Sequence, residues 1–135
     1  MPHPPANALM VRVYYEDTDF SGRVYYASYL RFLERGRTEW LRARGIGHRE
    51  MAEGSGLVFA VRSLRIDYLA PALMDDLLRV ETAVAAARGA SIEFRQHILR
   101  GDKQLAAAMV RIAAIRDGRT ARIPAELRRL FNPSQ

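Results

Sequence analysis

The sequence predicts an α+β fold in which a five-stranded antiparallel sheet wraps around one long central helix. One stretch, from about Ala27 to Arg44, repeats its apolar residues with the 3.6-residue period of a helix. The stretches with strand-like alternation are joined mostly by short turns, which allow antiparallel hairpins or a meander. Because the helix has one broad apolar face, the sheet must curl to bury it.

Length and composition indicate a single globular domain over residues 1–135, with the Pro-rich residues 1–7 flexible. Apolar residues make up 49% and charged residues 27%, which is typical of a folded protein. The absence of cysteine excludes a disulfide scaffold and thiolate metal sites. The N-terminus lacks the pattern of a signal peptide, and the longest apolar run, Leu105–Val110, is too short to span a membrane. We therefore expect a cytoplasmic protein with no membrane span.

The positive charge of the chain favours a small polyanionic ligand over nucleic acid. The net charge is +6, and every basic residue except Lys103 is arginine. The arginines are scattered through all the predicted elements, whereas a nucleic-acid surface gathers them on one stripe. Arginine pairs with phosphate through two parallel hydrogen bonds, so the excess suits a phosphate-bearing ligand.

The first half of the chain predicts a strand followed by the long helix. In the strand, Leu9 to Glu16, every second residue is apolar or aromatic. Gly36 interrupts the apolar stripe of the helix, which predicts close approach of another backbone, and Gly45 is expected to end the helix. The stripe consists of Tyr29, Phe32, Leu33, Gly36, Trp40 and Ala43.

The second half predicts four strands between two short helices. A helix at Gly47–Glu53 comes first, and Pro124 at the first helical position opens a C-terminal helix at Ala125–Phe131. None of the possible edge strands is heavily charged or blocked by proline, so edge pairing into a dimer is expected. The four strands are predicted at Leu57–Leu69, Leu77–Ala87, Ser91–Arg100 and Leu105–Arg116.

The junction between the first strand and the helix is the candidate active site. It places Asp19 and the turn residue Gly22 just before a helix N-terminus, where backbone N–H groups lack partners. A carboxylate base or nucleophile beside such donors suits hydrolysis of an activated acyl group, with Tyr15, Tyr26 and Tyr29 lining an acyl slot. Acidic residues before a helix more often act as caps, so the residues alone leave both interpretations open.

A set of motifs along the chain points to one enzyme family. The chain resembles the YbgC-type acyl-CoA thioesterases, which belong to the 4-hydroxybenzoyl-CoA thioesterase branch of the hot-dog-fold proteins, over roughly residues 9–124. The motifs are Val11–Asp19, Gly22, Val24–Tyr25, Tyr29–Leu30, Glu34–Trp40, Ile66–Ala72, Asp75–Leu78 and Arg88–Gly89.

The resemblance implies a hot-dog fold, an acyl-CoA substrate and a homodimer or homotetramer with sites at subunit interfaces. It implies that Asp19 is the catalytic carboxylate and that the backbone N–H of Tyr26 polarises the thioester carbonyl. Relatives often have glycine at the position of Ser21 and histidine at that of Tyr26, so the acyl preference stays open. The basic surface also suits an acidic acyl carrier protein as the thioester carrier.

Several secondary assignments have plain structural alternatives. Arg88 and Arg122 are candidate ligands of the CoA phosphates, or simply exposed charges at turns. Glu34 is either a second carboxylate of the site or the surface partner of Arg37. The three histidines share no spacing typical of a triad or metal centre, so neither a metal nor a cofactor other than the CoA of the substrate is expected.

Two other functions remain as alternatives to thioester hydrolysis. A hydroxyacyl-thioester dehydratase usually employs a histidine near the helix, and no histidine lies between His3 and His48. A non-catalytic acyl-binding or adaptor protein of the cell-envelope machinery is the third possibility, because YbgC-type proteins resemble components associated with that machinery. The adaptor hypothesis predicts that replacing Asp19 with asparagine leaves function intact.

Overall fold

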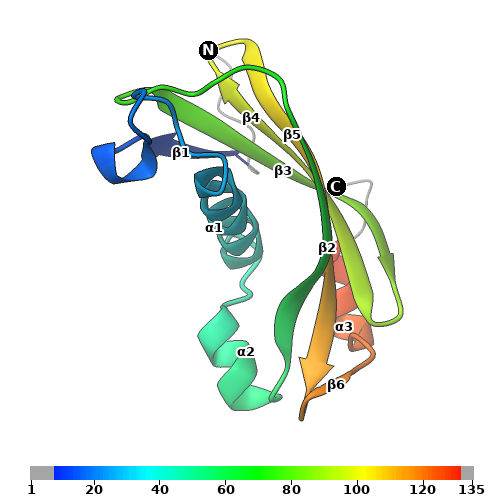
Figure 1. Cartoon of the computed structure of the whole chain (residues 1–135). Helices are drawn as coiled ribbons and strands as arrows, with labels where there is room; N and C mark the ends of the chain where they lie inside the picture. The colour runs from blue at the N-terminus through cyan, green and yellow to red at the C-terminus, as the bar shows by residue number, and fades with distance from the viewer. Residues whose placement is uncertain (1–7, 132–135) are drawn as a thin grey trace.

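The computed structural model describes residues 8–131, and its strands form one curled antiparallel sheet (Figure 1). The predicted flexibility of residues 1–7 falls outside the described part. In spatial order the strands run β1-β3-β4-β5-β2, and β6 pairs with β5. They span Ala8–Arg12 (β1), Val58–Tyr68 (β2), Leu77–Arg88 (β3), Ser91–Arg100 (β4), Lys103–Arg116 (β5) and Arg119–Thr120 (β6).

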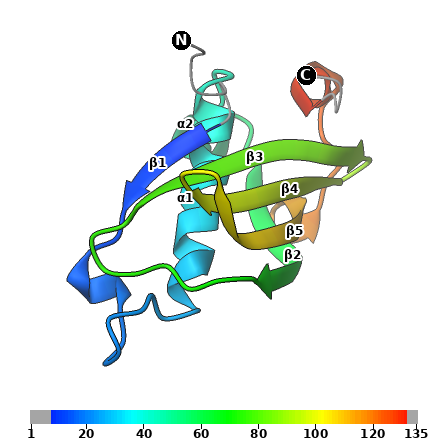
Figure 2. The same cartoon turned by 90° about the horizontal axis from the view of Figure 1, so that it is seen from above.

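One long helix, α1, lies against the concave face of this sheet, which confirms the predicted α+β hot-dog architecture (Figures 1 and 2). No helix of the described residues is both long and apolar enough to cross a membrane. The helices are α1 (Ser28–Arg42), α2 (His48–Gly54) and α3 (Ala125–Arg128), with 3₁₀ turns at Tyr15–Asp17 and Arg129–Phe131.

The prediction of hairpins and a meander is correct for β3, β4 and β5 but wrong for β2. That strand pairs with β5, at the opposite edge of the sheet from β1. The connection over residues 69–76 therefore crosses the end of the sheet to reach β3 (Figure 2). The short strand β6 was also not predicted. Periodicity defines the face of a strand but carries no information about its neighbours.

The first strand is shorter than predicted because a side chain intercepts its backbone. β1 ends at Arg12, and the residues from Tyr15 to Asp17 turn into a 3₁₀ helix. The carboxylate of Asp17 accepts a hydrogen bond from the N–H of Tyr14 at 2.9 Å. An aspartate that bonds to nearby backbone in this way offers the chain an alternative to the strand ladder.

Helix α1 buries the predicted apolar stripe with two corrections. A Cβ on Gly36 would lie 2.7 Å from Cγ1 of Val80, 3.0 Å from Oγ1 of Thr82 and 3.1 Å from Nε2 of Gln96, so side chains of β3 and β4 make the close approach that was predicted for a backbone. Ala43 is exposed, and it is the C-cap that follows the last residue of α1. Gly45, at φ = +81°, ends the helix as predicted, with the N–H of Ile46 donating to the carbonyl of Leu41 at 2.9 Å.

The far end of the core is closed by the C-terminal segment. The ring of Phe131 stacks on Trp40 of α1 with centroids 5.7 Å apart, and both are buried. Pro124 is the N-cap of α3 and precedes its first helical residue, because its ψ of 145° is extended. Arg37 is also buried and donates to Oε1 of Gln96 at 3.0 Å, so the predicted surface pairing with Glu34 is wrong.

Strand β2 is only partly covered on the inner face of the sheet. Helix α1 packs on β1 and β3, and α2 contacts β2, so Phe59 and Ile66 on this face are half-buried against the core while their neighbours stay exposed. Its register with β5 turns Val61, Leu64 and Tyr68 toward the helix side, and these side chains are 53%, 38% and 45% exposed. The sheet therefore ends in an apolar edge, and the candidate site lies at one end of that edge.

Candidate active site

Asp19 is the first residue of a tight turn that is closed by backbone hydrogen bonds. Its N–H donates to the carbonyl of Arg23 at 2.9 Å, and the N–H of Gly22 donates to the carbonyl of Asp19 at 3.2 Å. Gly22 has φ = +79°, a left-handed conformation that glycine adopts without strain. The turn is tied to the β2–β3 connection by the N–H of Val24, which donates to the carbonyl of Ala72 at 2.8 Å. Asp19 is thus held in a defined place although its side chain is exposed.

The carboxylate of Asp19 is stabilised as the anion by Ser21. Its Oδ1 accepts the hydroxyl of Ser21 at 2.6 Å and the N–H of the same residue at 2.8 Å. These hydrogen bonds, that of the hydroxyl first, lower the pKa of Asp19 below its ordinary value, and the positive charge of Arg23 adds to the effect. Asp19 is therefore ionised at neutral pH, as a base or a nucleophile must be.

Asp17, the other aspartate of the turn, has a structural position. It is buried, and its carboxylate accepts the N–H of Tyr14 at 2.9 Å and the guanidinium of Arg31 at 3.3 Å. Its carbonyl also accepts the N–H of Tyr25 at 2.9 Å. Of the two aspartates, Asp19 is therefore the one whose carboxylate is exposed to solvent.

The N-terminus of α1 presents two free backbone donors. The N–H of Ser28 donates to the carbonyl of Tyr25 at 2.8 Å, and that of Tyr29 donates to the carbonyl of Tyr26 at 3.3 Å. The N–H groups of Tyr26 and Ala27 have no acceptor within residues 8–131. Such donors, together with the positive end of the helix dipole, can stabilise an oxyanion.

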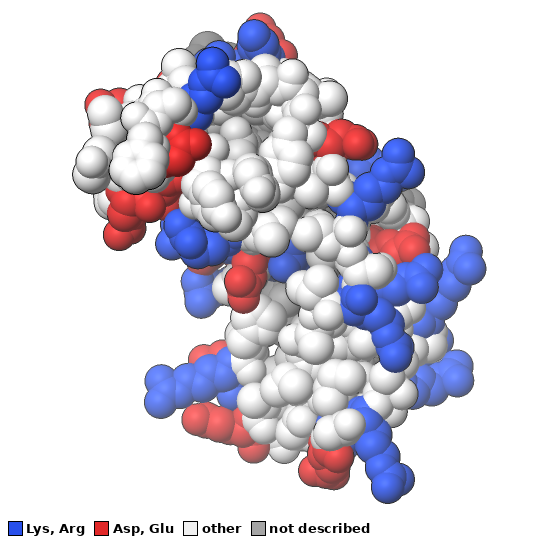
Figure 3. Space-filling model, in the orientation of Figure 1, with Lys and Arg blue, Asp and Glu red and all other residues white. Residues whose placement is uncertain are grey.

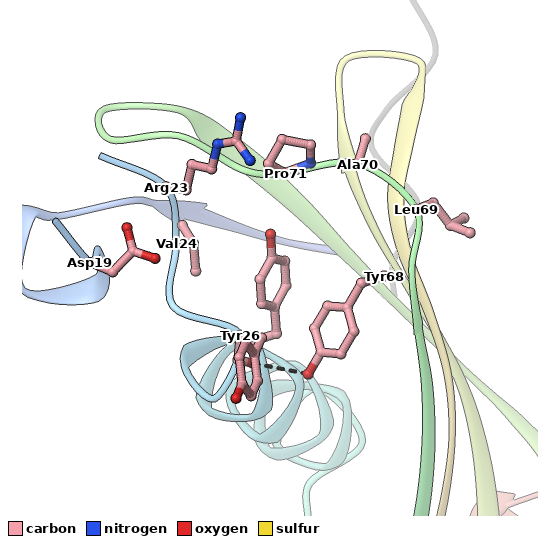
Figure 4. A pocket seen from close by; sticks show the side chains of 9 residues that line it. Asp19, Arg23, Val24, Tyr26, Tyr68, Leu69, Ala70 and Pro71 are labelled. Atoms are coloured by element: carbon pink, nitrogen blue, oxygen red, sulfur yellow. Dashed lines mark hydrogen bonds between the residues drawn. The ribbon is translucent and has the colours of Figure 1, made fainter. Parts of the chain in front are cut away.

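A pocket of about 580 Å³ brings the carboxylate and the helix terminus together (Figure 4). The turn and the start of α1 form one wall, and the end of β2 with the following loop forms the other. The floor is mainly apolar, and Asp19 stands at its rim. The lining residues are Asp19, Arg23, Val24, Tyr26, Tyr29, Tyr68, Leu69, Ala70 and Pro71.

Tyrosine side chains dominate the pocket wall. Tyr29 is buried, and its hydroxyl accepts the N–H of Ala72 at 2.9 Å. Tyr68, from the end of β2, donates its hydroxyl to the carbonyl of Tyr26 at 3.0 Å (Figure 4). Partial burial, with Tyr29 and Tyr26 nearby, raises the pKa of Tyr68. Sequence reasoning placed Tyr68 on a strand face but missed it as a site residue, because its distance from Tyr26 depends on the tertiary fold.

Tyr15 lies apart from the other predicted lining residues. It is 80% exposed and borders a second depression of about 600 Å³ on the other side of the acidic turn. Asp19 belongs to both depressions, and Gly22 lines only the second. The predicted set is therefore divided, with Asp19, Tyr26 and Tyr29 in one pocket and Tyr15 outside it.

Arg88 and Arg122 lie at the opposite end of the sheet from Asp19 (Figure 1). Arg88 ends β3 and borders a small cavity of about 70 Å³ with Ser91, Glu93 and Arg111. Arg122 is exposed just before α3. In Figure 3, basic side chains predominate along the right-hand side of the face shown, with some acidic ones among them, and further acidic side chains gather on the lobe at upper left. Within one chain, neither arginine reaches the pocket.

The described residues hold no cluster of three or more histidine, aspartate and glutamate side chains suited to a metal ion. The Nε2 atom of His48 is 3.2 Å from the Oγ1 of Thr38, away from the pocket, and His97 lies on β4. His3 belongs to the residues outside the described part. That the chain needs no metal or cofactor stays a prediction.

Comparison with known proteins adds independent information to this geometry. The family model of the thioesterase-like superfamily matches residues 13–131. The chain is 44% identical over 124 residues to a protein of Haemophilus influenzae named acyl-CoA thioesterase YbgC, covering 90% of this chain and 91% of that protein. It is 46% identical over 96 residues to the acyl-CoA thioester hydrolase YbgC of Escherichia coli, covering 70% of each.

A solved structure shows the same fold. The probable thioesterase from Bartonella henselae superposes with a TM-score of 0.84 at 42% identity, covering 87% of this chain and 98% of the other. The matched region includes the acidic turn, the start of α1 and the end of β2, which together build the pocket. The chain belongs to the thioesterase-like superfamily, as a relative of the YbgC-type proteins.

Proposed function

We propose that this protein hydrolyses acyl-CoA thioesters to a free acid and a thiol, in the pocket between the acidic turn and α1. That it is a thioester hydrolase follows from its family and its YbgC relatives. One observation carries the assignment of the site, namely that Asp19 and Tyr26, whose N–H has no acceptor within residues 8–131, line the same pocket. A thioester carbonyl placed between them meets a carboxylate on one side and an oxyanion donor on the other.

The chemistry divides between these two groups. The N–H of Tyr26 receives the oxyanion that forms as the carbonyl carbon becomes tetrahedral, and losing such a donor costs about 10²–10³ in rate. Asp19 acts by one of two routes. It takes a proton from water, whose oxygen then attacks the carbonyl, or it attacks directly to form a mixed anhydride that water hydrolyses. In both routes the CoA thiolate leaves and is protonated.

Single-turnover hydrolysis in ¹⁸O-labelled water separates the routes. Direct attack, followed by water addition at the carboxylate carbon of Asp19, leaves ¹⁸O in the protein, whereas the general-base route puts the label only into the released acid. Mass spectrometry of the peptide containing Asp19 reads the difference. Water addition at the acyl carbon of the anhydride would also put the label only into the acid, so a labelled peptide establishes direct attack, whereas an unlabelled peptide fits either the general-base route or this form of direct attack.

The main test measures thiol release with a thiol-reactive dye. We expect Asp19→Asn to lower kcat by about 10²–10⁴-fold, the usual contribution of a positioned acid–base group. Asparagine keeps the size of the side chain and an oxygen that can accept from Ser21. Glu16→Gln, which neutralises an exposed acid of the same turn, is the matched control and should retain activity. Wild-type kcat in Asp19→Asn across the substrate panel would overturn the assignment of the carboxylate.

The acyl group is best identified with a panel that runs from short aliphatic through long-chain to aromatic CoA esters. The apolar, tyrosine-lined wall accepts either kind of chain. Thioesters of an acyl carrier protein belong in the panel, because the net charge of +6 suits an acidic carrier. The pocket lining contains no histidine, the group that a dehydratase would need near the helix.

A homodimer paired through β2 accounts for the open edge and for the distant arginines. Within residues 8–131, β2 has a strand neighbour on one side only, and its inner face carries exposed apolar side chains. Antiparallel pairing of two β2 strands would satisfy the open edge and join this apolar face to the same face of the partner's sheet. It would also turn the end of the partner's sheet that carries Arg88 and Arg122 toward the pocket, where they could bind CoA phosphates.

A further inference from the structure

The hydroxyl of Tyr68 makes a contact that packing alone does not require. It donates at 3.0 Å to the carbonyl of Tyr26, a residue 42 positions earlier in the chain. Tyr68 ends β2, whereas Tyr26 lies in the turn just before α1 begins at Ser28. The bond therefore ties the edge strand to the helix terminus that carries the free donors.

Apart from the bond from Tyr68, the carbonyl of Tyr26 accepts only a weak hydrogen bond within residues 8–131. Its other hydrogen bond comes from the N–H of Tyr29 at 3.3 Å, which is long for a helical bond. Two tyrosine rings enclose the phenol of Tyr68, with Tyr29 at 5.2 Å and Tyr26 at 6.0 Å between centroids, both edge-on. These edge contacts lie on the side of the half-exposed Tyr68 ring that faces α1, where its hydroxyl meets the carbonyl.

The peptide group that receives this bond is the one that joins Tyr26 to Ala27. In a planar trans peptide the N–H points opposite to the C=O, so the N–H of Ala27 is directed out of the helix terminus. That N–H has no acceptor within residues 8–131. A hydrogen bond to the carbonyl polarises the same peptide and makes its N–H a stronger donor. Tyr68 thus acts on a free N–H that neighbours the N–H of Tyr26.

We propose that Tyr68 is a positioning residue for thioester hydrolysis, which holds and polarises the Tyr26–Ala27 peptide so that the N–H of Ala27 serves as a second oxyanion donor. The inference rests on the proposed function of the pocket. Oxyanion donors work only when held within about 0.5 Å of the productive geometry, and this peptide lies outside the regular part of α1. The bond from β2 supplies the restraint that the helix itself does not.

The test is Tyr68→Phe, which removes only the hydroxyl. We expect kcat to fall about tenfold, a fraction of the loss for a deleted oxyanion donor, while KM changes by less than about twofold. Tyr25→Phe is the matched control, because Tyr25 is half-exposed in the same turn and does not line the pocket. Its kcat should stay within about twofold of wild type.

A spectroscopic readout separates positioning from packing. Infrared spectra of a ¹³C-carbonyl acyl-CoA bound to Asp19→Asn protein should show the carbonyl band below that of the free ester, because oxyanion donors weaken the C=O bond. Adding Tyr68→Phe to the Asp19→Asn protein should move the carbonyl band part of the way back toward its position in the free ester. An unmoved band, or a rise in KM with kcat unchanged, would assign Tyr68 to packing and overturn the proposal. Failure of the proposed function would look different, because the wild-type protein would then release no thiol.

Discussion

Ser21, two residues after Asp19 in the chain, determines the pKa of Asp19 by hydrogen bonding to its carboxylate. Its hydroxyl and its N–H both donate to the same carboxylate oxygen, and together they lower the pKa of Asp19. A lower pKa keeps the carboxylate ionised over a wider pH range but makes it a weaker base. Ser21 is therefore the residue through which this turn adjusts the reactivity of Asp19.

Replacing Ser21 with alanine should therefore shift the acidic limb of the pH profile. The active form of Asp19 is the carboxylate, so kcat/KM falls as the pH drops through its pKa. Removing the hydroxyl raises that pKa toward its ordinary value, and activity should be lost at a higher pH than in wild type. The measurement is kcat/KM against pH, over the range in which circular dichroism shows a folded protein.

Thr18→Val is the control for this shift. The hydroxyl of Thr18 lies in the same turn but donates to the carbonyl of Tyr15 at 2.7 Å and does not contact Asp19. Its removal should leave the acidic limb where it is in the wild-type protein. Equal limbs in Ser21→Ala and wild type would show that the hydroxyl does not control the Asp19 pKa.

At the scale of an element, α1 depends on the absence of a side chain at Gly36. The helix approaches β3 and β4 so closely there that a Cβ would meet Val80, Thr82 and the amide of Gln96 at 2.7–3.1 Å. That amide also donates to the carbonyl of Leu33 and to the hydroxyl of Thr82, both at 2.9 Å. Gly36 therefore sets how closely α1 packs against the sheet, and with it the position of the helix N-terminus in the pocket.

We expect Gly36→Ala to destabilise the protein. Overpacking a core costs about 1–3 kcal/mol, and the better helix propensity of alanine returns about 1 kcal/mol. The net loss, up to about 2 kcal/mol, is measurable by urea unfolding. Gly54→Ala is the control, because nothing lies within 4 Å of a Cβ at that helical position and its stability should be unchanged or slightly higher. Equal stability of Gly36→Ala and wild type would show that the neighbouring side chains move aside freely.

At the scale of the whole molecule, the described chain leaves the β2 edge of the sheet and part of an apolar face uncovered at the same place. The open edge is β2, and the uncovered face carries Val61, Leu64 and Tyr68. Because Tyr68 also touches the helix terminus, a partner that covers this face would close the pocket against water. Exclusion of water strengthens the electrostatic stabilisation of an oxyanion. Assembly and catalysis are thus expected to depend on the same strand.

A single introduced cysteine can test this dimer, since the natural chain has none. Ser63 is exposed near the middle of β2, so a two-fold axis there would bring the two copies of this position together. We expect Ser63→Cys, or Arg62→Cys at the adjacent bulge, to form a disulfide-linked dimer on mild oxidation. Non-reducing gel electrophoresis detects the disulfide-linked dimer, and light scattering measures the mass of the protein in solution.

Glu53→Cys, on exposed α2, serves as the control for random collision and should stay monomeric on the gel. A protein that scatters light as a monomer at catalytic concentrations would exclude the dimer. Whether two dimers associate further, and whether residues 1–135 form one domain, remain predictions from the sequence.

The sequence by itself determined the elements that local periodicity encodes. The 3.6-residue stripe and Gly45 define α1, and the alternating patterns define four long strands with their faces. The acidic turn before the helix was likewise visible as a candidate site, because Asp19 and the helix terminus are close in the chain. Tyr15 shows the limit of such reasoning, since the 3₁₀ turn directs it away from the pocket that Tyr26 and Tyr29 share.

Only the tertiary structure decided which strands are neighbours and which distant residues meet. The pairing of β2 with β5, and the contact from Tyr68 to Tyr26, join segments about 40 residues apart or more. Periodicity reports which face of an element is buried, but each long-range pairing is selected by the packing of the whole sheet around α1. The second wall of the pocket comes from that packing, and so does the hydroxyl that holds the helix terminus.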